Sequence, residues 1–199
     1  MKKPALLLAA CALTAGCAAP AYVSPVQVTR FVSETPAVLG QGTVQIMAAP
    51  GLDADSLEFA VYADAVRQEL QALGYSVVDE GGAQTAMIAI ESGVLAAESR
   101  RGPVSVGAGG STGRYGSGVG VGVGINLGSL SGPPPERIER EIFVALQSNE
   151  LTTNLWEGRA TMVATTNSDY AADAAAAARM ADALFAGFPG NSGETIEIE

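Results

Sequence analysis

The stretch Arg137-Ile138-Glu139-Arg140-Glu141-Ile142-Phe143-Val144-Ala145-Leu146 decides the fold class. In an extended chain, successive side chains point to opposite sides, so this stretch has one largely apolar side and one acidic side. The apolar side carries Ile138, Ile142, Val144 and Leu146, and the acidic side carries Glu139 and Glu141. A strand of this kind buries one face only, which is typical of an antiparallel sheet covered on one side.

Other segments of the chain predict more strands, from their β-propensity and partial alternation. They are residues 26–32, 43–48, 75–78, 85–98 and 154–165.

Two helices are predicted from apolar residues that recur at helical spacing. The first runs from Ser56 to about Leu73, with a capping box formed by Asp55 and Glu58 at its start and Gly74 at its end. The second runs from Tyr170 to Ala186 and is capped by residues 167–169. Its expected inner face is Ala174, Ala177, Ala181, Leu184 and Phe185.

This order of elements predicts an α+β fold. We expect a two-layer sandwich in which a mostly antiparallel sheet has two helices packed on one face, plus a glycine-rich insert. The folded domain should span residues 26–190, and residues 191–199 should form a mobile acidic tail.

The predicted insert, residues 102–135, differs in composition from the rest of the chain. Residues 102–132 hold twelve of the 24 glycines, and three prolines follow. Val119, Val121, Val123 and Ile125 alternate with glycines. This pattern leaves three interpretations open: a flexible loop or weak hairpin, a strand that pairs with a partner, or part of an oligomeric pore. It also contains the letters of a phosphate-binding glycine loop, but no helical pattern follows them, as that motif requires.

The amino-terminal residues predict a signal peptide. Two lysines precede an uncharged run, Pro4 to Leu13, which is too short to span a bilayer as a helix. The run ends in Ala15-Gly16-Cys17, which resembles the lipobox of bacterial lipoproteins. This resemblance implies that residues 1–16 are removed by cleavage after Gly16 and that Cys17 is acylated.

Several acyl chains on one residue would anchor the protein stably, with residues 17–25 as a tether. Ala18 and Ala19 follow the cysteine in place of the aspartate that resembles an inner-membrane retention signal, which implies the outer membrane. Two alternatives stay open. Cys11 follows Leu8-Ala9-Ala10 and could be the acylated residue, or an ordinary signal peptide could leave Cys17 as a free thiol.

Composition narrows the possible functions. The chain carries 11 basic and 21 acidic residues, a formal charge of −10. Loss of residues 1–16 removes Lys2 and Lys3 and leaves a charge of −12, which argues against nucleic acid as a partner. The absence of histidine from the sequence removes the commonest general base and the commonest transition-metal ligand.

Four further stretches carry a family resemblance: residues 28–31, 73–75, 156–158 and 184–189. Together with the lipobox, they resemble the bacterial lipoproteins of the domain-of-unknown-function 4136 family. The resemblance covers about residues 24–190. It implies an envelope location and a fold similar to a small α/β module that serves other envelope lipoproteins in binding and assembly. The family has no agreed activity, so it supplies no functional residues.

Candidate catalytic residues each have a structural explanation. Asp53 and Asp55 read as helix capping, and Asp79 and Glu80 read as a solvated turn. Glu139 and Glu141 with Arg137 could hold a metal or act as an acid and base, but opposite charges on a wet strand face explain them.

Trp156 could line a ligand groove, but core packing is the simpler explanation. Without histidine, no Ser-His-Asp triad is available. We therefore expect no cofactor, metal or catalytic site.

The sequence predicts a lipid-anchored envelope protein of the outer membrane, facing the periplasm. Its domain would bind another envelope protein or self-associate, and the candidate contact residues are Val119, Val121, Val123, Ile125 and Trp156. A small-molecule- or glycan-binding domain, or a carboxylate-dependent hydrolytic domain near Trp156, is the alternative. A third possibility is an oligomeric pore or secretion accessory that uses the insert.

Overall fold

The computed structural model describes residues 19–34, 38–95, 104–113, 116–125 and 134–199. These residues belong to two compact units, and each unit is considered by itself. The main domain comprises residues 21–96 and 136–199, and the hairpin unit comprises residues 1–20 and 97–135.

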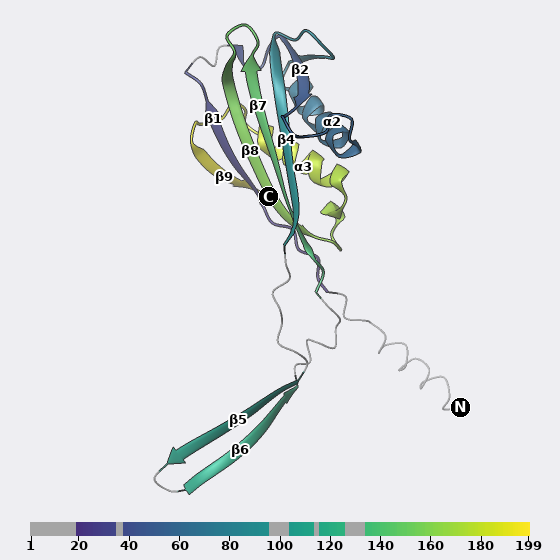
Figure 1. The fold of residues 1–199 in the computed structure, drawn as a ribbon. Helices are drawn as coiled ribbons and strands as arrows, with labels where there is room; N and C mark the ends of the chain where they lie inside the picture. Colours follow the sequence, from purple (N-terminus) through teal and green to yellow (C-terminus); the bar gives the residue numbers. More distant parts are fainter. Residues whose placement is uncertain (1–18, 35–37, 96–103, 114–115, 126–133) are drawn as a thin grey trace, which may run out of the picture. The chain divides into compact units, whose positions relative to one another are not determined.

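The main domain is a seven-stranded sheet with two helices (Figure 1). The strand order is β3-β2-β4-β7-β8-β1-β9. β2 pairs parallel with β3 and β4, and every other neighbouring pair is antiparallel. The elements are β1 (Val26–Val32), β2 (Thr43–Ala48), α2 (Leu57–Ala72), β3 (Ser76–Val78), β4 (Gln84–Leu95), β7 (Arg137–Ser148), β8 (Thr153–Thr165), the 3₁₀ helix η4 (Asp169–Ala171), α3 (Asp173–Phe185) and β9 (Glu194–Ile198). The predicted α+β fold with a mostly antiparallel sheet is confirmed.

Both helices lie on one face of the sheet (Figure 1), which makes two layers. The helices contact each other, α2 also contacts β2 and β3, and α3 also contacts β8 and β1. The core fills the space between the layers because alternate strand residues point to this side. In β7 these residues are Ile142, Val144 and Leu146, all fully buried, as the alternation predicted.

The capping prediction for α2 is wrong by one residue. The N-cap is Ser56, whose hydroxyl accepts a hydrogen bond from the Phe59 N–H at 3.1 Å. The Asp55 N–H, which the predicted capping box would pair with Glu58, donates instead to the Asp53 carboxylate at 3.0 Å and forms a turn just before the helix. The predicted end is confirmed, since Gly74 adopts a φ of 104° after the C-cap residue Leu73.

The start of α3 also differs from the prediction. Residues 169–171 form the 3₁₀ helix η4, and α3 begins at Asp173 without a side-chain cap. The Arg140 guanidinium donates hydrogen bonds to the carbonyls of Tyr170 and Ala171, which in a continuous helix would accept from the N–H groups of the next turn. The buried face shifts accordingly: Ala174 is exposed, and Ala176 and Met180 are buried beside the predicted Ala177, Ala181, Leu184 and Phe185.

Two buried arginines of the sheet hold α3 at its two ends. Arg140 on β7 donates from Nε and Nη2 to Asp173 Oδ1, at 3.1 and 2.8 Å. Arg30 on β1 donates from Nε to the Leu184 carbonyl at 3.0 Å and from Nη2 to the Ala183 carbonyl at 2.9 Å. An acidic group at the helix start and a cation at the last carbonyls both oppose the helix dipole. The two arginines therefore fix α3 against the sheet.

The predicted mobile tail is wrong. Residues 194–198 form β9, which pairs antiparallel with β1 and completes one edge of the sheet. The reason lies in alternation: Ile196 and Ile198 stand opposite the buried Val28 and Val26 and extend the apolar face by one strand.

The hairpin unit contains two ten-residue strands, β5 (Val104–Gly113) and β6 (Gly116–Ile125). They pair antiparallel over their full length, from Val104 opposite Ile125 to Gly113 opposite Gly116. Across the described part of the chain, no helix combines the length and apolar character that crossing a membrane requires.

Candidate functional site

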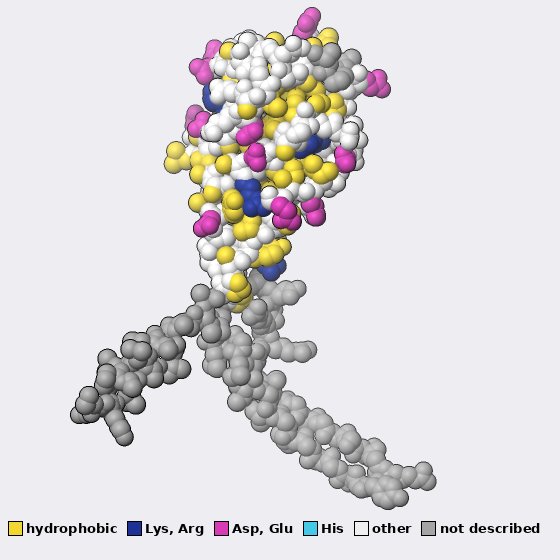
Figure 2. Space-filling model, turned by 180° about the vertical axis from the view of Figure 1, so that it is seen from behind, with side chains coloured by type: hydrophobic (Ala, Val, Ile, Leu, Met, Phe, Trp, Pro, Cys, Tyr) yellow, Lys and Arg dark blue, Asp and Glu magenta, His cyan; other side chains and the backbone are white. Residues whose placement is uncertain are grey.

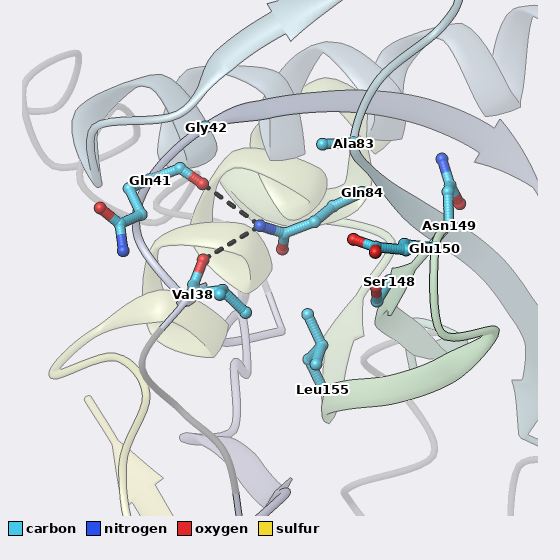
Figure 3. Close-up of a pocket in the computed structure, with 9 residues that line it drawn as sticks. All are labelled: Val38, Gln41, Gly42, Ala83, Gln84, Ser148, Asn149, Glu150 and Leu155. Atoms are coloured by element: carbon cyan, nitrogen blue, oxygen red, sulfur yellow. Dashed lines mark hydrogen bonds between the residues drawn. The ribbon is translucent and has the colours of Figure 1, made fainter.

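One pocket of about 410 Å³ lies at the end of the main sheet where β4 begins and β7 ends (Figure 3). Its wall comes from three distant parts of the chain: the segment before β2, the start of β4, and the β7–β8 turn with Leu155. The lining residues are Val38, Gln41, Gly42, Ala83, Gln84, Ser148, Asn149, Glu150 and Leu155.

Gln84 organises this pocket. Its side chain is nearly buried, and its Nε2 donates to the carbonyls of Val38 and Gln41 at 3.0 and 3.2 Å (Figure 3). Its Oε1 accepts from the Tyr75 hydroxyl at 3.4 Å. Burial raises the pKa of Tyr75, and a backbone hydrogen bond with Gly40 opposes that shift in part. Tyr75 therefore stays a neutral donor, and Gln84 ties the segment before β2 to the sheet.

A second group of hydrogen bonds fixes the rim on the other side. Asn149 Nδ2 donates to the Gly82 carbonyl at 2.7 Å, and Asn149 Oδ1 accepts from the Thr85 hydroxyl at 2.8 Å. Gln45 Nε2 donates to the same hydroxyl at 3.1 Å. These bonds join β2, β4 and the turn after β7, so the pocket is held in shape before any ligand arrives.

The chemistry of the pocket is mostly neutral. Glu150 is the single charged residue of its lining, and Figure 3 shows its carboxylate facing the same space as the Gln84 amide. The Ser148 hydroxyl accepts from the Leu151 N–H at 3.3 Å. Amide, hydroxyl and backbone groups beside the carbon surface of Val38 and Leu155 suit the binding of a neutral or cationic polar group.

Sequence reasoning did not identify this pocket. Residues 82–85 and 147–150 read separately as turns rich in amide and small side chains. Only the pairing of Gln84 with Ser148 across β4 and β7 brings them together, and register is not readable from either segment alone.

The sequence-predicted lipid attachment site lies outside the described residues. This applies to Cys17, to the cleavage position Gly16 and to the alternative Cys11. Of the candidate contact residues, Val119, Val121, Val123 and Ile125 lie on β6.

Trp156 is a core residue, so its prediction as a partner-binding residue is corrected. It is 1% exposed, its Nε1 donates to the Pro189 carbonyl at 2.9 Å, and its ring stacks on Phe185 with 5.3 Å between centroids. Gly158 makes room for the indole, since a Cβ there would lie 2.3 Å from the ring. Alternation puts Trp156 on the helix-facing side of β8, where a partner cannot reach it.

The candidate carboxylates do not converge. Glu141 on β7 pairs with Arg159 on β8 on the uncovered face of the sheet, which agrees with the interpretation of opposite charges on a wet face. Glu141 stands opposite Thr161, four residues along β8 from Glu157, which corresponds to about 13 Å. On the face shown in Figure 2, acidic side chains are scattered over the described surface. Among the described residues, no three potential ligands of the Asp, Glu, His and Cys types are grouped to hold a metal.

A smaller hollow of about 330 Å³ lies where β1 ends and β8 begins. Phe31, which is 54% exposed, lines it together with Ser33, Asn154 and Glu157. Asn154 Nδ2 donates to the Glu157 carboxylate, so the acidic group of this hollow is already engaged.

The pocket and the hollow lie on a two-layer α+β domain whose sheet is mostly antiparallel. No family model matches the chain, and no curated protein matches it. The resemblance to the domain-of-unknown-function 4136 family therefore stays a prediction.

Solved structures match at low sequence identity. The chain is similar to a PDZ domain protein from Parabacteroides distasonis, with a TM-score of 0.51 and 12% identity over 96% of this chain and 42% of the other. The chain thus spans less than half of that protein. It also matches a PelC dodecamer from Paraburkholderia phytofirmans, with a TM-score of 0.43 and 10% identity over 84% of this chain and 99% of the other. These similarities concern the fold alone.

Proposed function

We propose that this chain is an outer-membrane lipoprotein whose periplasmic domain binds an envelope partner or further copies of itself without performing catalysis. The anchor would be Cys17, after cleavage at Gly16, as the lipobox resemblance implies. The partner would meet the domain at the Gln84 pocket.

The neutral chemistry of the Gln84 pocket is the observation that carries this proposal. The side chains of Gln84, Asn149 and Thr85 form hydrogen bonds with other groups of the protein, and these bonds hold the pocket walls in place. Val38, which lines the pocket, is 46% exposed, and Leu151, which follows the lining residue Glu150, is 65% exposed. A rigid neutral hollow beside exposed apolar groups is suited to receiving a side chain of a partner protein.

The second candidate function is glycan binding at the hollow beside Phe31. An exposed aromatic ring next to Asn154 and Glu157 favours it. Hydrolysis at this place would need a second carboxylate at most about 10 Å from that of Glu157, and the carboxylate of Glu141 is already paired with Arg159.

The experiment is site-specific photocrosslinking in intact cells. A photoreactive residue at Leu151, beside the pocket, should capture a defined envelope protein, and the same residue at the exposed Glu58 on α2 should not. The substitution Ser148→Trp, which fills the pocket, should abolish capture. Capture from Glu58 as readily as from Leu151, or capture that survives Ser148→Trp, would contradict the assignment of the pocket.

Anchoring is tested separately with a palmitate analogue. The wild-type chain should retain the label and sediment with the outer membrane, and Cys17→Ser should lose both properties. If the label moves instead to Cys11, the chain is still a lipoprotein with a different anchor. A wild-type chain that carries no label overturns the lipoprotein proposal.

A further inference from the structure

The hairpin formed by β5 and β6 differs from the main sheet in how its edges are protected. The main sheet ends in β3, of three residues, and in β9, of five residues that include Glu194 and Glu197. Short strands and charged residues are the usual devices that prevent a sheet edge from pairing with another chain. The main domain uses both.

The hairpin edges lack these devices. β5 and β6 have ten residues each and contain neither a charged residue nor a proline. Their pairing runs without a register shift from one end to the other. A long, regular, uncharged edge is a template for another strand because its outward N–H and C=O groups are unpaired.

We propose that the hairpin is a self-association element, in which β6 of one copy pairs edge to edge with β5 of the next. This inference rests on the proposed function, since it names the copies of the chain as one partner. An isolated two-stranded hairpin is marginally stable in water, and glycine-rich strands lose the most entropy on ordering, so added strands are what would stabilise it.

The distribution of charge indicates that the strand that pairs with the hairpin edge belongs to a second copy of the chain. The whole chain carries −10, so copies repel each other over most of their surface. The two hairpin strands are free of charge and equal in length, so they can meet without repulsion and pair along all ten residues.

The register supports the same arrangement. Glycine stands opposite glycine at Gly107–Gly122 and Gly109–Gly120, and valine opposite valine at Val106–Val123. A hairpin added in the same register continues one row of glycines and one row of valines across the new sheet. Because each hairpin offers two edges, we expect assemblies larger than a dimer.

The test measures oligomeric size in the full-length chain, purified in detergent, by light scattering over a range of concentrations. The variant Val121→Lys/Val123→Lys places charges on β6, and Thr195→Lys places one on the β9 edge as the control. The hairpin variant should associate about tenfold more weakly or worse, because lysines on an edge strand oppose its pairing with another chain. Thr195→Lys should leave the assembly unchanged.

Direct contact is tested with cysteines on the hairpin. Thr112→Cys on β5 and Ser117→Cys on β6 stand opposite each other in this register, so the two variants mixed in one sample should give disulfide-linked pairs, whereas Thr195→Cys should not. The cysteine experiment uses a Cys11→Ser/Cys17→Ser background, and the light-scattering comparison is repeated in it. If assembly persists there, it is independent of the anchor, so failure of the lipoprotein proposal and failure of this one give different results.

Trp156 fluorescence confirms that the main domain of each variant is folded. A chain that is monomeric at all concentrations, or an assembly that Val121→Lys/Val123→Lys leaves intact, overturns the inference.

Discussion

Removing the Asp173 carboxylate should destabilise the main domain by about 2–3 kcal/mol. In Asp173→Ala, the Arg140 guanidinium keeps its bonds to the carbonyls of Tyr170 and Ala171 but loses the two to Asp173 Oδ1. The Arg140 side chain is 3% exposed, so water cannot replace the lost carboxylate.

The magnitude follows from the two exposures. Leaving one charge of a buried pair without its partner costs about 3–5 kcal/mol. The Asp173 side chain is 51% exposed, so the cost of breaking its pair with Arg140 is lower than this and shifts toward the value of about 0–1 kcal/mol for surface pairs. Loss of an acidic residue from the first turn of α3 adds about 0.3–1 kcal/mol.

Urea unfolding provides the assay because the chain has a single tryptophan, and Trp156 is buried against α3. The matched control is Asp182→Ala, an exposed acidic residue of the same helix, which should change stability by less than about 0.5 kcal/mol. A double-mutant cycle with Arg140→Met should show a coupling of about 1–2 kcal/mol. Equal stability losses in Asp173→Ala and Asp182→Ala, or a coupling near zero, would refute the reasoning.

Three further predictions concern the same domain. Arg30→Met should lower the free energy of unfolding in urea by about 2–4 kcal/mol, because it removes the hydrogen bonds to the last carbonyls of α3. The control Arg67→Ala, which removes a half-exposed ion pair, should lower it by less than about 0.5 kcal/mol, and equal losses would contradict this prediction. Gly158→Ala should cost about 1–3 kcal/mol and shift the tryptophan emission, because its Cβ would lie 2.3 Å from the Trp156 ring, and an unchanged spectrum and stability would disprove the tight contact. Burial raises the pKa of Tyr62 from 10.0 to about 12, so as the pH rises the Tyr62 hydroxyl loses its proton first in the unfolded chain. The free energy of unfolding should therefore fall between about pH 10 and 12. Tyr62→Phe should remove the share of this fall that Tyr62 causes, as measured by urea unfolding at several pH values.

The fold could be predicted from the sequence where alternation and helix signals were strong. The row of Ile142, Val144 and Leu146 gave the buried face of β7, and Gly74 gave the end of α2. The helix starts were displaced because local and distant groups competed for the same backbone atoms: the Asp53 carboxylate before α2 and the Arg140 guanidinium before α3.

The sequence contained an indication of the two arginines that hold α3, and it was not used in the prediction. Arg30 and Arg140 stand at strand positions where alternation calls for an apolar residue, and a charge in such a position requires a buried partner. The Gln84 pocket had no comparable signal, because its walls meet only after the strands have found their register.

The position of β1 in the sheet has a consequence for biosynthesis. β1 precedes every other strand of the main sheet along the chain, yet among the described residues its partner strands are β8 and β9, for example Thr29 opposite Arg159 and Thr195. These neighbours begin only at Thr153 and Glu194, so the nascent chain must carry an unpaired apolar strand until both have been made. Such distant pairings fold slowly, so a protease or holding chaperone would meet this chain chiefly before β8 and β9 have been made.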